Sequence, residues 1–479
     1  MLQRLLTDSM GVGQVISIDT LPDDVLLLIF DFYLQKCLSP DESTWVWQSL
    51  VHVCRRWRSV VFGSPRRLDL RLSCTPITRS RDMLDIWPIL PLIIDGRWVY
   101  STRTVDNIVA ALKCSDRVCQ INLSIKKIYL AAMQQPFPEL THLDLWWCNQ
   151  TDEAEVVPDS FLGGFAPRVE SLKLIGLPFP GLPKLLLSAT HLAILWLHDI
   201  PHSGYFSPDA MIAALSTLIS LKELTLGFES PESCPDLETR RLPPSTRSVL
   251  PVLKFFEFKG VSEYLEDLVT DIDAPQLNKL RITFFNDSVF YTPRLIRFIS
   301  CTPMSSALEN AHIVLWEDLA HVTFLSQKYD YVGLEVSILC EGLGWKLSFL
   351  EQVCTSCLPF LSTLKDLYIH EEDLYWADDF ENREWLELLH PFTDVENLYL
   401  SEQLAPLIGP ALQELVEGRT TEVLPALQNI FLEGFKSLGP VEEGIGQFVA
   451  ARQVASHPVE ISLWANSKED KARAFEQLD

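Results

Sequence analysis

One short pattern recurs along most of the chain: an apolar residue, two residues of any kind, a second apolar residue, one residue of any kind and a third apolar residue. The last two apolar positions alternate with polar ones, which is typical of a short half-buried strand. The copies are Val118/Ile121/Leu123, Leu140/Leu143/Leu145, Val169/Leu172/Leu174, Leu192/Leu195/Leu197, Leu221/Leu224/Leu226, Leu253/Phe256/Phe258, Leu277/Leu280/Ile282, Leu364/Leu367/Ile369, Val395/Leu398/Leu400 and Leu427/Ile430/Leu432.

A single strand of this kind cannot bury its own apolar face, so neighbouring copies must stack into one array. Intervening segments such as 208–217 and 288–300 have helical spacing. We expect two degenerate copies in the longest gap, near 308–313 and 333–338. The sequence therefore predicts an α/β fold in which a leucine-rich-repeat solenoid of strand–helix units, horseshoe-like, spans residues 118–465. A charged tail, 466–479, follows.

The first sixty residues have a helical pattern instead. Within residues 17–35, Pro22, Asp23 and Asp24 favour the start of a helix, and a second helical pattern, in one or two pieces, runs to Gly63. Apolar side chains follow both helices at three- and four-residue spacing, more than some fifty residues can bury. These stripes either dock on a partner or pack against the first repeats. Short strands over 68–72 and 91–95, with a helix over 77–87 between them, are expected next.

The segments LPDDVLLLIFDFYL and LVHVCRRWRSVVFGSP resemble an F-box. Together with RRLDLRL, WPILPLII and the later repeats, they make the chain similar to the large fungal families of F-box proteins with leucine-rich repeats. The F-box part of the resemblance covers residues 16–64, and 65–117 then form a linking segment or N-terminal cap of the solenoid. The insert from Lys36 to Trp47, which is long and carries two tryptophans, departs from the family pattern.

The resemblance implies the substrate receptor of an SCF-type cullin-RING ubiquitin ligase complex, which serves ubiquitin-dependent protein degradation. Family members bind a Skp-type adaptor, and through it a cullin, with the F-box, while the repeats bind a target protein. Carried over by matching position, the adaptor-binding residues are Leu21, Pro22, Val25, Ile29, Phe30, Leu50, Val53, Cys54 and Trp57.

If the strands line a concave face, the side chains between the apolar positions point outward from that face. This middle row comprises Asp144, Lys173, Trp196, Thr225, Glu257, Arg281, Tyr368, Tyr399 and Phe431. Two aromatic groups form the candidate target-binding residues, namely Trp146, Trp196 and His198 on early repeats and Tyr368, His370, Tyr399 and Phe431 on late ones. They are either interface anchors or core residues beneath a covering segment.

The formal net charge is −25, and nearly all of the acidic excess follows residue 133. Such a surface repels phosphate backbones and anionic lipid headgroups, so neither nucleic acid nor a membrane is an expected partner. A basic protein target fits better. Acidic runs at 371–373 and 378–381, interleaved with Tyr375 and Trp376, either receive a basic peptide or are solvated loops.

The N-terminal segment lacks the apolar stretch of a secretory signal, and no apolar run reaches the roughly 20 residues of a membrane span. The 11 cysteines, an odd number, fit reduced thiols better than a disulfide framework. We therefore expect an intracellular protein of the cytoplasm, the nucleus or both.

Catalytic signatures are missing from the sequence: Gly-x-Ser-x-Gly, His-Glu-x-x-His and a Walker loop do not occur. Cys354 and Cys357 form an isolated pair that supplies half of a zinc site, and two core cysteines are favoured over a redox pair. We expect no catalytic residue, metal or cofactor. The alternatives are a leucine-rich-repeat interaction scaffold without ligase activity and an enzyme with an unrecognised site.

Overall fold

The computed structural model describes residues 18–36, 40–76, 80–96, 105–147, 155–233, 247–285, 292–306, 308–325, 332–340, 343–357, 361, 364–371, 382–416, 419–433 and 440–464. They divide into two compact units. Unit 1 contains the described residues of Met1–Ser124, Ala131–Met133 and Phe137–Leu140, and unit 2 contains those of Ile125–Leu130, Gln134–Pro136 and Thr141–Asp479.

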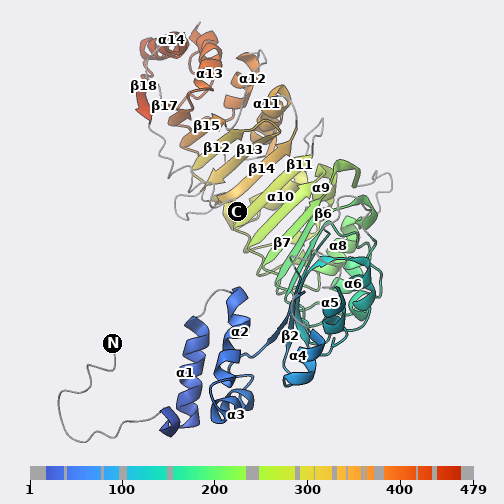
Figure 1. Ribbon diagram of the computed structural model, residues 1–479. Helices are drawn as coiled ribbons and strands as arrows, with labels where there is room; N and C mark the ends of the chain where they lie inside the picture. Colours follow the sequence, from blue (N-terminus) through green and yellow to red (C-terminus); the bar gives the residue numbers. More distant parts are fainter. Residues whose placement is uncertain are drawn as a thin grey trace, which may run out of the picture. The chain divides into compact units, whose positions relative to one another are not determined.

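Unit 1 begins with three helices, α1 (Asp23–Lys36), α2 (Pro40–Val51) and α3 (Arg55–Gly63) (Figure 1). The helix expected within 17–35 is confirmed as α1, and the second helical pattern is broken into α2 and α3. The Arg56 guanidinium joins α3 to the start of α1, because Nη2 lies 2.7 Å from Asp23 Oδ1 and also donates to the Leu21 carbonyl. This arginine therefore connects the N-terminal ends of α1 and α3.

The rest of unit 1 is a parallel sheet in the order β1-β2-β3 with two further helices. The elements are β1 (Leu72–Cys74), α4 (Ser80–Ile86), β2 (Leu92–Gly96), α5 (Val105–Leu112) and β3 (Val118–Ile125). The strand expected over 68–72 is wrong, since β1 begins only at Leu72. Leu68 and Leu70 are buried as the alternation suggested, but Asp69 adopts a positive φ of 46°, which interrupts an extended backbone.

Unit 2 contains a long sheet whose strands follow the order β4-β5-β6-β7-β9-β11-β14-β13-β12-β15-β16-β17-β18. The last two apolar residues of every motif expected from Leu140 onward lie on one of these strands, and the first precedes the strand by two residues. Equivalent leucines meet in register, as in Leu172↔Leu195↔Leu224. The strands are β4 (His142–Trp147), β5 (Ser171–Ile175), β6 (Ile194–Ile200), β7 (Glu223–Phe228), β9 (Phe255–Gly260), β11 (Lys279–Phe285), β12 (Asn310–Leu315), β13 (Leu319–Leu325), β14 (Val332–Leu339), β15 (Asp366–Glu371), β16 (Asn397–Leu400), β17 (Asn429–Glu433) and β18 (Glu460–Trp464).

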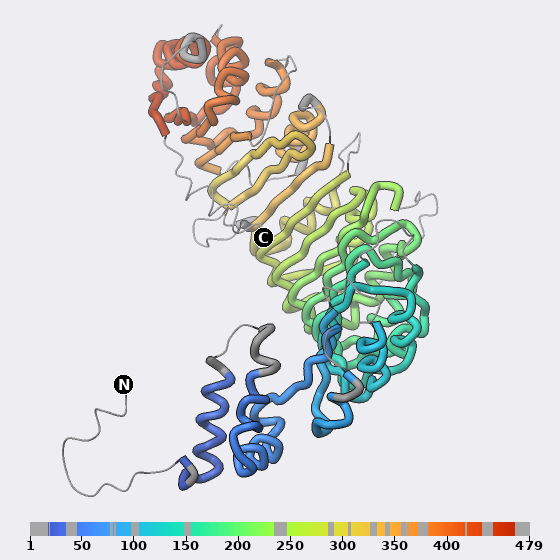
Figure 2. Tube along the Cα trace, viewed as in Figure 1, coloured from blue at the N-terminus to red at the C-terminus, as the bar shows by residue number. Residues whose placement is uncertain are grey.

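Helices cover one side of this sheet, as Figures 1 and 2 show. Consecutive helices pack side by side from α7 to α10 and again from α11 to α14. Burial alternates along strands such as β9 and β16. The apolar residues of the repeated motif therefore face the helices, and the residues between them face the other side of the sheet. The helices after β3 are α6 (Lys127–Ala132), α7 (Leu182–Leu186), α8 (Pro208–Leu215), α9 (Ser262–Thr270), α10 (Pro293–Ser300), α11 (Leu343–Gln352), α12 (Asn382–Leu389), α13 (Ala405–Gln413) and α14 (Pro440–Val454). This architecture is a leucine-rich-repeat-like solenoid of mixed α/β class.

The two degenerate copies are confirmed as the strands β12 and β14, but their arrangement is not that of further strand–helix repeats. They flank the antiparallel strand β13. In this three-stranded meander the order of the strands in the sheet is opposite to their order in the sequence, so β14 pairs with β11 while β12 pairs with β15. The amide of Trp316 donates to the carbonyl of Leu319 at 2.8 Å in the β12–β13 turn. Lys346 is buried and donates to the carbonyl of Trp316 at 2.6 Å, which ties this turn to α11.

Helices α13 and α14 approach closely at Gly409 and Gly444. A Cβ on Gly444 would lie 2.8 Å from the Gly409 carbonyl oxygen, a backbone atom that cannot move aside. We expect Gly444→Ala to lower the free energy of unfolding by about 1–3 kcal/mol. On the same helix, a Cβ on Gly446 has nothing within 4 Å, so Gly446→Ala should raise it by up to about 1 kcal/mol. Urea unfolding of both variants checks this, and equal effects would contradict it.

Candidate functional site

Helix α1 carries two apolar stripes. Leu26, Leu27 and Phe30 are buried in the helical module, whereas a second stripe remains on the surface. That exposed stripe consists of Val25, Leu28, Ile29, Phe32 and Tyr33, with Phe32 70% exposed. A stripe this apolar, exposed from Val25 to Tyr33 in the part of the chain that the structure describes, is typical of a surface that binds another protein.

The residues predicted to bind an adaptor divide between the surface and the core. Val25, Ile29, Val53, Cys54 and Pro22 are exposed, and Leu21 and Trp57 are half-buried. The other two are placed differently: Phe30 is fully buried and Leu50 is 5% exposed, so both belong to the core of the module. Helical spacing groups residues on a face, but it does not say which face the other two helices cover.

Three exposed apolar residues of α1 are missing from the predicted set, namely Leu28, Phe32 and Tyr33. Phe32 and Tyr33 follow Ile29 at three- and four-residue spacing, so the helical pattern of the sequence was a sufficient signal to include them. Leu28 lies one position before Ile29, beside the stripe traced at three- and four-residue spacing. We define the docking stripe as Val25, Leu28, Ile29, Phe32, Tyr33 and Val53.

The end of α2 and the start of α3 hold Val53 beside a well-defined helix N-terminus. The Cys54 side chain caps α3 by accepting a hydrogen bond from the Trp57 amide at 3.4 Å. The Trp57 ring in turn packs on Phe30, with ring centroids 4.7 Å apart. Trp57 therefore links the buried stripe of α1 to the surface, so its role is partly structural.

The insert that departs from the family pattern forms much of α2. Trp47 is buried, donates from Nε1 to the Arg71 carbonyl at 3.0 Å and packs edge-on against Trp87 at 5.2 Å. Phe62 of α3 joins the same aromatic cluster. One of the two tryptophans of the insert is thus a core residue; the side chain of the other, Trp45, lies outside the described residues.

The side of the unit 2 sheet opposite the helices carries a continuous aromatic stack. In register across four strands, His312, Tyr368, Tyr399 and Phe431 stack with ring centroids 4.2, 4.1 and 4.5 Å apart. Trp464 approaches Tyr399 edge-on at 5.4 Å. We call these five residues the aromatic ladder.

Sequence reasoning found three members of the ladder and missed two. His312 was recognised as a strand residue, but only the reversed meander places β12 beside β15. Trp464 lies on β18, beyond the last recognised motif. His370, which was predicted with this group, contacts His312 at 6.3 Å rather than joining the stack.

The early aromatic group is looser than predicted. Trp196 contacts His198 at 5.5 Å, and Lys173 Nζ lies 4.0 Å above the Trp196 ring in a cation–π contact. Trp146 pairs in register with Ile175, which pairs with His198, so it lies one row away from Trp196. These half-buried rings form a small mixed patch instead of a stack.

Charges on the same side of the sheet are mostly paired. Arg281 lies between Glu335, 3.0 Å from its Nε, and Glu257, 3.7 Å from its Nη1. Burial raises the pKa of the Glu335 carboxyl above its usual value, although the neighbouring Arg281 acts in the opposite direction.

Beside the aromatic ladder, Asp366 accepts a hydrogen bond from Asn397, which in turn accepts one from Asn429. The ladder thus has a carboxylate at its edge.

Within the described residues, no group of three or more His, Cys, Asp or Glu side chains could hold a metal ion, and no helix could span a bilayer. Cys354 is buried in the π-helical turn Val353–Cys357, where it acts as a core residue. The acidic run after Glu371, with Tyr375 and Trp376, lies outside the described residues.

The geometry defines a class of protein: a helical docking module followed by a repeat solenoid, with a protein-interaction role. Comparison with known families gives the second step, because residues 18–71 match the F-box-like family. No curated protein sequence matches the chain. Among solved structures, the leucine-rich repeat-containing protein LegL7 from Legionella pneumophila is similar over 79% of this chain and 97% of its own, with 12% identity and a TM-score of 0.27.

Proposed function

We propose that this protein is the substrate receptor of an SCF-type ubiquitin ligase. The helical module docks a Skp-type adaptor and through it a cullin, and the solenoid binds a target protein. The observation that carries the proposal is the exposed docking stripe within a segment that matches the F-box-like family. The chain acts as a non-catalytic adaptor in the cytoplasm or nucleus.

The docking stripe supplies a free energy of the right size. Its side chains are about half exposed, so each contributes on the order of 1–2 kcal/mol when covered. The six side chains together give roughly 6–12 kcal/mol, comparable to an association cost of about 4–15 kcal/mol. Because the two free energies are similar, loss of the contribution of one side chain should be enough to prevent a stable complex with the adaptor.

On the solenoid, the aromatic ladder is the favoured target-binding surface. Stacked rings are already ordered, so little side-chain entropy is lost when a partner covers them, and aromatic residues dominate interface energies. The carboxylate of Asp366 at the ladder edge and the acidic excess of the chain favour a basic target segment. This assignment includes Tyr368, Tyr399 and Phe431 and adds His312 and Trp464.

Binding of a purified Skp-type adaptor, measured by calorimetry, tests the proposal. We expect Ile29→Asp to weaken binding at least about a hundredfold, because it places a charge in the centre of an apolar contact. Ile89→Asp is the matched control, since Ile89 is 84% exposed in unit 1 but lies outside the docking stripe. Circular dichroism verifies that both variants fold.

Absence of binding by the folded wild-type chain would refute the adaptor assignment, as would equal binding by both variants. A chain that binds the adaptor but supports no ubiquitin transfer to any captured protein, in a reconstituted cullin-RING reaction, would favour the alternative of an interaction scaffold without ligase activity. Affinity capture with residues 16–64 removed retains targets that the complete complex would destroy, and so identifies them.

A further inference from the structure

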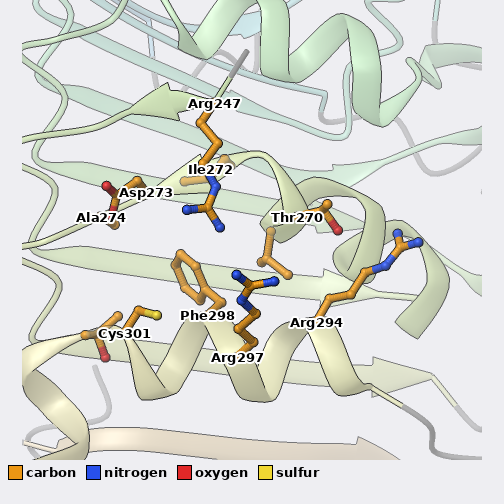
Figure 3. Close-up of a pocket in the computed structure, with 11 residues that line it drawn as sticks. Arg247, Thr270, Ile272, Asp273, Ala274, Arg294, Arg297, Phe298 and Cys301 are labelled. Carbon is orange, nitrogen blue, oxygen red and sulfur yellow. The ribbon is translucent and has the colours of Figure 1, made fainter. Parts of the chain in front are cut away.

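A pocket of about 300 Å³ opens on the helical side of unit 2, away from the aromatic ladder. Figure 3 shows it between α10, the end of α9 and the short strand β10 (Ile272–Asp273), which pairs with β8 (Ser248–Val249). Three of its lining residues are arginines, in a chain where acidic residues outnumber basic ones by 64 to 39. The described residues that line it are Arg247, Val269, Thr270, Ile272, Asp273, Ala274, Arg294, Arg297, Phe298, Cys301 and Thr302.

The three arginines differ in their partners. Arg294 forms an ion pair with Asp267 at 2.7 Å and points aside in Figure 3. Arg247 and Arg297 extend toward each other from opposite sides of the pocket, and neither guanidinium has an ion pair or hydrogen bond with any residue that the structure describes. Two like charges directed into one cavity repel each other, and an anion between them would remove that repulsion.

The acidic groups that the structure describes near the pocket do not pair with Arg247 or Arg297. Glu266 accepts hydrogen bonds from the backbone amides of Arg294 and Leu295, at 3.1 and 2.7 Å, and so serves as the cap of α10. Asp267 is engaged by Arg294, as described above. Among the lining residues that the structure describes, Asp273 is the one carboxylate, whereas three of them are arginines. The described part of the lining therefore has a net positive charge.

The remaining lining limits what can bind. Phe298 and Ile272 are buried and form an apolar floor. The hydroxyls of Thr270 and Thr302 donate to the backbone carbonyls of Glu266 and Ile299, respectively, each at 2.7 Å. The hydrogen-bond donors available to a ligand are therefore the guanidinium groups of Arg247 and Arg297. Guanidinium pairs match tetrahedral oxyanions, and a volume near 300 Å³ is at the small end of ligand pockets.

We propose that this pocket binds the phosphate group of a small phosphomonoester, held between Arg247 and Arg297. A phosphomonoester carries about two negative charges at neutral pH, which balance the two unpaired guanidinium groups. Its organic part would rest against the floor formed by Phe298 and Ile272. The proposal rests on the pocket alone and does not depend on adaptor docking, which involves unit 1.

Calorimetric titration of the full chain tests this, with two probes: inorganic phosphate and a phosphoserine peptide whose other side chains are uncharged. The unphosphorylated peptide is the reference. We expect Arg247→Gln and Arg297→Gln each to weaken binding about tenfold, and the double variant about a hundredfold, because each removes one charge-assisted pair. Arg419→Gln is the matched control, since Arg419 is an exposed arginine of unit 2 that pairs with Glu422 outside the pocket.

Loss of binding in the pocket variants but not in Arg419→Gln supports the proposal. A phosphopeptide that binds at least about tenfold more tightly than inorganic phosphate identifies a phosphorylated side chain as the source, whereas equal affinity identifies a free phosphate compound. The proposal is overturned if neither probe binds at several millimolar, about the affinity expected of a weak site, or if all variants bind alike. The positions are exposed, and circular dichroism confirms that each variant folds.

Discussion

Replacement of Arg452 by alanine is expected to lower the free energy of unfolding by about 3–5 kcal/mol. Arg452 of α14 is fully buried and has no carboxylate partner among the residues that the structure describes. Its guanidinium donates instead to three backbone carbonyls in the segment before β17, those of Thr420 at 2.9 Å, Pro425 at 3.2 Å and Leu427 at 3.0 Å. Alanine leaves three buried acceptors without donors and opens a cavity.

Urea unfolding followed by circular dichroism measures this effect. Arg452→Lys should be intermediate, because an ammonium group retains the charge but cannot reach three carbonyls in a planar fork. The control Arg419→Ala removes an exposed arginine paired with Glu422 and should cost less than about 1 kcal/mol. If Arg452→Ala lowers the free energy of unfolding no more than this control, the hydrogen bonds of the Arg452 guanidinium do not stabilise the C-terminal repeats.

Acidification from pH 8 to pH 5 is expected to destabilise unit 2 by roughly 4 kcal/mol through two histidines. Burial lowers the pKa of His312 and of His321 from 6.5 to about 3, and the nearby His370 adds to both shifts. Arg281 and His312 further lower the pKa of His321. The unfolded chain therefore takes up protons first, and the stability that these neutral imidazoles contribute above about pH 6.5 is lost as the pH falls toward 3.

The variant His312→Gln/His321→Gln isolates this contribution. Glu266 and Glu335 have a pKa raised by burial, so their contribution to stability changes with pH in the opposite direction. They are present in both proteins and cancel in the comparison. Urea unfolding at pH 8 and pH 5 should show a smaller loss for the variant than for the wild-type chain, while His142→Gln, at an exposed position of β4, should match the wild type. Equal losses for all three proteins would contradict the prediction.

The repeat pattern could be predicted because it is local. The spacing of Leu195 and Leu197 on one strand is enough to define a half-buried face, and every copy from Leu140 to Leu432 forms the expected strand. The order of strands in the meander could not be predicted. Ile313 and Val336 both lie in segments that alternate apolar and polar residues as a half-buried strand does. The strands that lie beside these segments are determined by hydrogen bonds between parts of the chain that are distant in sequence. The domain boundaries drawn from the sequence stay predictions.

The candidate docking residues show the same limit. Helical spacing correctly grouped Val25 with Ile29, and both are exposed. The resemblance to the F-box placed Phe30 and Leu50 in the same adaptor-binding set, although they pack inside the module. For the ladder, Tyr368, Tyr399 and Phe431 followed from repeat register, whereas Trp464 required knowledge of where β18 pairs.

The sequence by itself determined that apolar side chains recur at strand spacing over most of the chain and at helical spacing near its start, because such periodicity is a property of neighbouring residues. Only the tertiary structure decided which stripe of α1 is covered, that β12 lies beside β15, and that Arg247 and Arg297 face one pocket. Those outcomes depend on contacts between segments far apart in the chain, and local spacing carries no record of which distant segment covers a given face.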